Sequence, residues 1–113
     1  MPSARINDGR TLTGTVPGIP GLYDGFDFDY RPARPAAVYE HRRAATTKTP
    51  AGELRADCEH VLAHLTGWNL QDDSGADQPR SVDTLQGLFH TALNVMLNHV
   101  NGYTVSEDAQ AKN

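Results

Sequence analysis

The chain has 113 residues, a net charge of −4, an apolar fraction of 38% and a mean hydropathy of −0.54. This length supports one domain at most, since domains commonly hold about 100–150 residues. The low apolar fraction indicates that part of the chain lies outside the core, as arms or tails. A single cysteine, Cys58, excludes an intramolecular disulfide and any all-cysteine metal site.

Charge is distributed unevenly along the chain. Residues 1–50 carry seven Lys or Arg and five Asp or Glu (net +2), whereas residues 51–113 carry three and nine (net −6). An acidic C-terminal half argues against a general nucleic-acid-binding protein, which needs a basic face to neutralise phosphates. We expect neither a membrane span nor a signal peptide, because no apolar stretch approaches about 20 residues and the first ten residues contain no apolar core region.

The N-terminal third contains two predicted strands. In residues 26–31, FDFDYR, aromatic side chains alternate with charged ones, which is typical of a strand with one buried face. Residues 10–16, RTLTGTV, form a shorter candidate strand. Two Pro-Gly pairs in residues 17–25 predict an irregular connection, so the two strands should form a hairpin with a long loop.

The remainder is predicted to be helical. A short helix should begin at Pro35 and run to residue 45. The second helix, about residues 50–66, has Thr49 as its N-cap and Gly67 as its stop. Its apolar stripe follows the helical period and consists of Leu54, Cys58, Val61, Leu62 and Leu65.

A third helix is predicted from Ser81 or Asp83, as the cap, to about Asn101, with Gly102 as its stop. The fold class expected is therefore α+β, mainly α, with an N-terminal β-hairpin or extended arm packed on about three helices. We divide the chain into an N-terminal arm and first strand (1–25), a compact helical domain (26–103) and a flexible tail (104–113).

The acidic turn after the second helix does not fit the pattern of a calcium-binding loop. Placing Gly75 at the sixth position of an EF-hand loop puts Leu70 at the first position and Ser81 at the twelfth, where oxygen ligands are required. Ser81 cannot replace the bidentate Glu, and Leu70 offers no side-chain oxygen. The turn is therefore interpreted as a solvated Asp/Gly turn between two packed elements.

His60 and His64 lie one helical turn apart and share a flank with Glu53 and Asp57. A zinc protease would need Glu directly after the first histidine, where this chain has Val61. A metal stripe is one interpretation of this flank and a solvated helix face is the other. We assign no metal, no cofactor and no catalytic residue.

Cys58 and the basic cluster of residues 31–43 are both interpreted as structural rather than functional. Cys58 lies on the apolar stripe without a neighbouring histidine, which is typical of a small buried hydrophobe rather than a nucleophile. The basic cluster of residues 31–43 alternates with acidic residues, which favours surface ion pairing over an anion site. Its arginines are Arg31, Arg34, Arg42 and Arg43.

The third predicted helix has an unusually wide apolar face. Residues 84–106 contain no Asp, Glu, Lys or Arg, although exposed helix faces normally carry charge. We therefore hypothesise that this helix buries a second face against a partner or another subunit. The alternative is a central helix wrapped by its own domain. The candidate partner-binding residues are Leu93, Asn94, Val95, Leu97 and Asn98.

Arg31-Pro32 follows the aromatic strand, and the stretch GWNLQDDSGADQP (67–79) leads into the final helix. With these motifs, the order of the elements over about residues 26–103 resembles the tail assembly chaperone-like proteins of tailed bacteriophages. Asn69 stands where Asp is more common in that family, and the family has no catalytic residue to transfer.

The resemblance implies an assembly role in the host cytoplasm, in which the chain binds tail proteins such as the tape-measure or tail-tube protein. In this interpretation Gly67, Trp68 and Gly75 form a structural joint. The alternatives are a structural virion component of the tail or head–tail connector, and a small nucleic-acid-binding regulator that uses the arginine cluster. A homo-oligomer is compatible with the first two.

Overall fold

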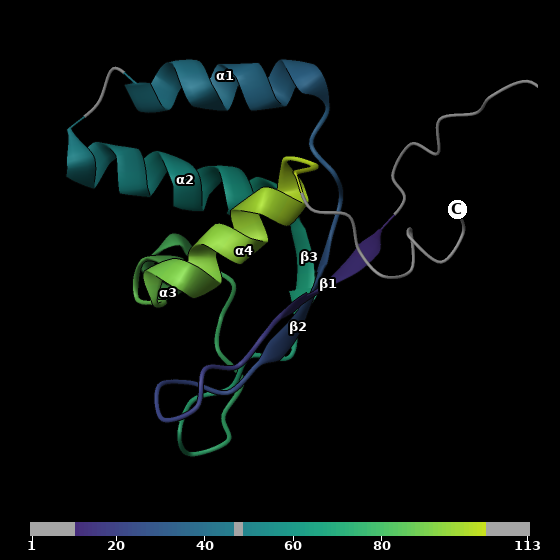
Figure 1. Ribbon diagram of the computed structural model, residues 1–113, viewed down its shortest axis with the longest axis vertical. Coiled ribbons are helices and arrows are strands. Elements are labelled where there is room, and N and C mark those ends of the chain that lie inside the picture. Colours follow the sequence, from purple (N-terminus) through teal and green to yellow (C-terminus); the bar gives the residue numbers. More distant parts are fainter. Residues whose placement is uncertain (1–10, 47–48, 104–113) are drawn as a thin grey trace, which may run out of the picture.

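The computed structural model describes residues 11–46 and 49–103. These ranges contain strands β1 (Leu12–Val16), β2 (Phe26–Tyr30) and β3 (Leu65–Trp68), and helices α1 (Pro35–Thr46), α2 (Pro50–His64), α3 (Val82–Gln86) and α4 (His90–Val100). Figure 1 shows the hairpin packed beside the helices, with α1 stacked on the outer side of α2. The expected α+β class with an N-terminal hairpin is confirmed. The expected arm at residues 1–10 and tail at residues 104–113 lie outside the described residues.

The three strands form one antiparallel sheet in the order β1-β2-β3. Phe28 pairs with Gly14 on one side and with Trp68 on the other. The alternation predicted for β2 is confirmed, because its aromatic side chains are buried while Asp27 and Asp29 accept hydrogen bonds from threonine hydroxyls of β1 at 2.8 Å. Val16 of β1 is buried in the same core as β2, so the strand assigned to the N-terminal segment is part of the folded unit.

β3 was missed by the sequence analysis, which extended α2 to residue 66. The helix ends at His64, because Leu65 adopts an extended conformation and pairs with Tyr30 of β2. Gly67 does not stop the helix as predicted, since it lies within β3 opposite Asp29. The predicted N-cap is confirmed: the Thr49 hydroxyl accepts a hydrogen bond from the Gly52 amide at 3.2 Å.

The predicted third helix is interrupted and forms two helices, α3 and α4. Ser81 caps α3 by accepting a hydrogen bond from the Thr84 amide, as one of the two predicted caps. Gly87, which has a weak helix propensity, follows α3, and Phe89 is extended. The break changes the direction of the chain and lets both short helices contribute to one core. Gly102, with φ of 80°, ends α4 as predicted.

The core lies between the inner face of the sheet, α2 and the α3–α4 pair. His99 is buried in it, with its ring edge-on to Phe28 and Tyr30. The other buried core residues are Val16, Phe26, Cys58, Val61, Leu65, Leu85, Ala92, Leu93, Met96 and Val100.

The Phe28 ring packs against Gly14, in the space that a side chain at position 14 would fill. A Cβ atom at Gly14 would lie 2.6 Å from Cζ of Phe28, and this ring is too closely packed to move. Gly14→Ala should therefore lower the free energy of unfolding by about 1–3 kcal/mol, measured by urea unfolding. Gly67→Ala is the control, since its Cβ would meet only the Asp29 carboxylate at 3.3 Å. An equal loss in both variants would contradict this account.

Candidate protein-binding groove

A groove of about 1150 Å³ opens at one end of the molecule. It is formed by three segments that are distant in sequence: the hairpin loop between β1 and β2, the acidic turn after β3, and the corner between α3 and α4. The first two segments lie side by side below the sheet in Figure 1.

The hairpin loop brings apolar side chains to the groove. Ile19 pairs with Tyr23 across the tip of the loop, and Gly21 adopts φ of 78° there. At its base, a Cβ on Gly25 would lie 2.8 Å from the Val16 carbonyl oxygen, so glycine is required for the close approach. Leu22, near the tip of the loop, lies on the surface with 47% of its area exposed. The prediction of an irregular connection is confirmed.

An aromatic pair attaches the loop to α4. The rings of Tyr23 and Phe89 stack with their centroids 5.3 Å apart, and the Tyr23 hydroxyl is hydrogen-bonded to the Thr91 hydroxyl at 2.8 Å. Phe89 nevertheless keeps 49% of its area exposed, because the break before α4 turns it toward the groove. The exposed apolar wall therefore consists of Ile19, Leu22 and Phe89.

The acidic turn is closed by its own hydrogen bonds. One carboxylate oxygen of Asp72 accepts from the amides of Ser74 and Ala76 and from the Ser74 hydroxyl. These bonds hold the pKa of Asp72 below its usual range. Gly75 adopts φ of 85° at the tip. The interpretation of this segment as a solvated turn is confirmed. In the ranges that the structure covers, no three His, Cys, Asp or Glu residues are placed to hold a metal ion.

Trp68 connects the sheet to the acidic turn. Its Nε1 donates to the Gln78 carbonyl oxygen at 2.9 Å, and its ring meets Phe26 edge-on. Asn69 adds a second link, because its side-chain oxygen accepts from the Asp27 amide. Of the residues predicted as a joint, Gly67 and Trp68 are neighbours in β3, whereas Gly75 lies at the distant tip of the turn.

The predicted partner-binding residues of α4 do not form one exposed face. Leu93 is 5% exposed and belongs to the core, and Val95 and Leu97 pack partly against it. Asn94 is exposed and Asn98 is half-buried. The residues that sequence reasoning missed are those of the loop, Ile19, Leu22 and Tyr23. Apolar side chains within a loop rich in Pro and Gly were the available signal.

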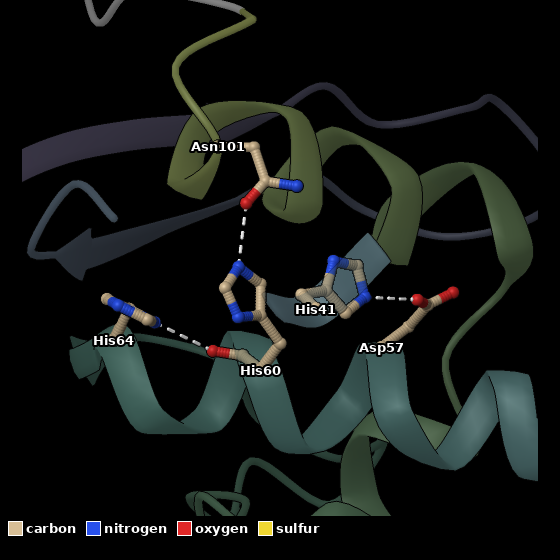
Figure 2. A network of polar contacts seen from close by, with 5 residues as sticks. All are labelled: His41, Asp57, His60, His64 and Asn101. Carbon is tan, nitrogen blue, oxygen red and sulfur yellow. Dashed lines mark hydrogen bonds and ion pairs between the residues drawn. The ribbon is translucent and has the colours of Figure 1, made fainter. Parts of the chain in front are cut away.

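A histidine network joins α1, α2 and the end of α4 (Figure 2). The rings of His41 and His60 stack with centroids 4.3 Å apart. His41 Nε2 donates to the Asp57 carboxylate at 2.6 Å, and His60 Nε2 donates to the side-chain oxygen of Asn101 at 2.7 Å. His64 Nδ1 donates to the His60 carbonyl oxygen. Asp57, His60 and His64 are each partly buried, so this flank of α2 is not fully solvated. Within the described ranges, no three of its histidine and acidic side chains are placed to hold a metal ion.

Cys58 and the basic cluster of residues 31–43 have the surroundings that the sequence predicts. Cys58 is fully buried, and burial raises the pKa of its thiol to about 11, which is unsuited to a nucleophile. In the basic cluster, Arg43 pairs with Glu40, and Arg42 lies over the rings of Tyr39 and Tyr103. For Arg43 the predicted surface ion pair is confirmed.

Comparison of this chain with known proteins finds no matching family model, no matching curated protein and no matching solved structure. Among the described helices, none combines the length and apolar character needed to cross a membrane.

Proposed function

We propose that this chain is a non-enzymatic assembly protein of a tailed bacteriophage that binds tail proteins, such as the tape-measure protein, in the host cytoplasm. The observation that carries the proposal is the groove, whose wall exposes Ile19, Leu22 and Phe89. Contiguous exposed apolar side chains next to polar ones are typical of protein-binding surfaces. The resemblance supplies the class of partner.

The uncharged surface beside the groove supports the same proposal. The α3–α4 corner continues into a helix without Asp, Glu, Lys or Arg, and the exposed side chains at its start are His90, Thr91 and Asn94. Interface cores are depleted of charge relative to the rest of a protein surface. A partner seated in the groove could extend along this helix without desolvating charged groups.

The test is capture of tail proteins from phage-infected cells with the tagged chain. We expect a tail protein to be recovered with the native sequence and lost with Leu22→Ser/Phe89→Ser. Tyr39→Ser is the matched control, because Tyr39 is 65% exposed on α1, away from the groove. Recovery of no tail protein, or equal recovery with all variants, would contradict the proposal.

A second experiment separates the proposal from a structural virion role. An assembly protein should be absent from purified phage particles, whereas a tail or connector component should be present at fixed stoichiometry. Mass spectrometry of purified particles measures this directly. Presence in the particle would favour the structural alternative.

A further inference from the structure

We propose that the groove recognises a cationic amphipathic segment of the partner, in which apolar side chains are accompanied by Lys or Arg. This inference rests on the proposed function, that the chain binds a partner protein, and adds the chemistry of the segment that is bound. It follows from the charge, the shape and the apolar wall of the groove.

The charged residues that line the groove have one sign. They are Asp24, Asp72, Asp73 and Asp83, and no Lys, Arg or His is among the lining residues. Potentials of one sign in a concave site attract and select partners of the opposite sign.

The aspartates come from three separate segments, and within the described residues no three acidic side chains are placed to hold one metal ion. Asp24 is in the hairpin loop, Asp73 is in the acidic turn, and Asp83 is at the start of α3. The Asp72 carboxylate is already engaged by the amides of its own turn. Charges separated in this way match several basic side chains along a polypeptide better than a single cation.

Apolar side chains are exposed in the groove between these charges. Leu22 and Phe89 are about half exposed, and Leu70 and Leu88 line the groove beside them. A volume of about 1150 Å³ is above the range of about 300–1,000 Å³ that is usual for small-molecule pockets. An amphipathic segment that inserts apolar side chains into such a groove is a recurring mode of peptide recognition.

The probes are two synthetic peptides of equal length with identical leucine positions, one with lysine and the other with glutamate at the remaining positions. Calorimetric titration of the full chain should show that the lysine peptide binds at least about tenfold more tightly, equivalent to about 1.4 kcal/mol. Raising the salt concentration should weaken this binding. Amide shifts in the NMR spectrum should cluster at residues 19–25, 72–73 and 87–89.

Variants separate the charged and the apolar contributions. Asp24→Asn/Asp73→Asn should reduce affinity for the lysine peptide at least about threefold, and Leu22→Ser/Phe89→Ser at least about tenfold. The controls are Glu59→Gln and Tyr39→Ser, which alter exposed residues of α2 and α1. Both should bind like the native chain.

Several results would overturn the inference. These are equal binding of the two peptides, absence of binding, shifts centred on α1 and α2, or full affinity in the double Asn variant. Self-association that the groove variants abolish would instead identify a second copy as the occupant. If the double Asn variant still captures a tail protein while the Leu22/Phe89 variant does not, the proposed function holds and the cationic chemistry is wrong.

Discussion

Leu85→Ala should lower the free energy of unfolding by about 2–5 kcal/mol, the range for removing a fully buried leucine side chain. Leu85 is 0% exposed and lies at the centre of the core, although it belongs to the short helix α3. Its side chain holds α3 against α2, which fixes the corner where Phe89 turns toward the groove. The loss should therefore affect both stability and the shape of the groove.

Urea unfolding measures this change, and Leu54→Ala provides the control. Leu54 was placed on the same apolar stripe as Cys58 by the helical period, but it is 37% exposed near the start of α2. Its truncation should cost less than about 1 kcal/mol, because the side chain is already partly in water. Similar losses in the two variants would show that Leu85 does not anchor the core.

Acidification from pH 7 to pH 5 should destabilise the fold. Burial lowers the pKa of both His60 and His99 below the ordinary value of 6.5. The unfolded chain therefore binds protons at a higher pH than the folded one. The contribution of these two neutral histidines to the free energy of unfolding is fully present above pH 6.5. It is lost as the pH falls toward their lowered pKa values. Each histidine can contribute a slope of up to about 1.4 kcal/mol per pH unit in that window.

The surroundings of His60 explain this sensitivity. Its ring lies against His41 from α1 and near His64 on its own helix, and both would repel a proton on His60 when charged. Asp57 acts in the opposite direction, as does the hydrogen bond to Asn101, but desolvation is the largest cause. α1 contacts mainly α2, and its only buried residue within the described ranges is Val38. We therefore expect the α1–α2 contact to weaken first.

Urea unfolding at a series of pH values tests this prediction. His60→Gln removes the titrating group while keeping a donor toward Asn101, so it should flatten the pH dependence. His90→Gln is the control, because His90 is exposed at the start of α4. Stability that increases on acidification, or a His60→Gln variant with the native slope, would contradict the account.

The elements predicted correctly are those with a strong local pattern. Alternating aromatic and acidic residues define β2, and the Thr49-Pro50 pair defines the start of α2. In both cases adjacent residues contain the whole signal: side-chain alternation for the strand, and a hydroxyl acceptor followed by proline for the helix. The tertiary structure does not override either preference.

The errors arise where tertiary contacts decide the local structure. Leu65 continues the helical stripe, yet pairing with Tyr30 places it in β3. In residues 81–101 apolar side chains recur continuously at the helical period. The helix is nevertheless interrupted after Gln86, at Gly87, and the two short helices pack against the same core. Period alone cannot distinguish one long helix from two short ones joined at a glycine.

The groove was beyond sequence reasoning because three separate segments form it. The acidic turn was recognised only as a connection, and Phe89 was assigned to the apolar stripe of a long helix. Its exposure depends on the break before α4, and the stack with Tyr23 depends on the hairpin loop reaching that corner. The histidine network has the same origin: His60 and His64 were identified together, but His41 comes from another helix.

The most direct test of the central proposal, that the groove is the binding site for a tail protein, is hydrogen exchange on the chain alone and in complex with the captured tail protein. The account predicts new protection at residues 19–25, 72–73 and 87–89, with the α1 surface around Tyr39 unchanged. Protection confined to α1, or centred on Asn94 and Asn98 with the groove unaffected, would contradict it.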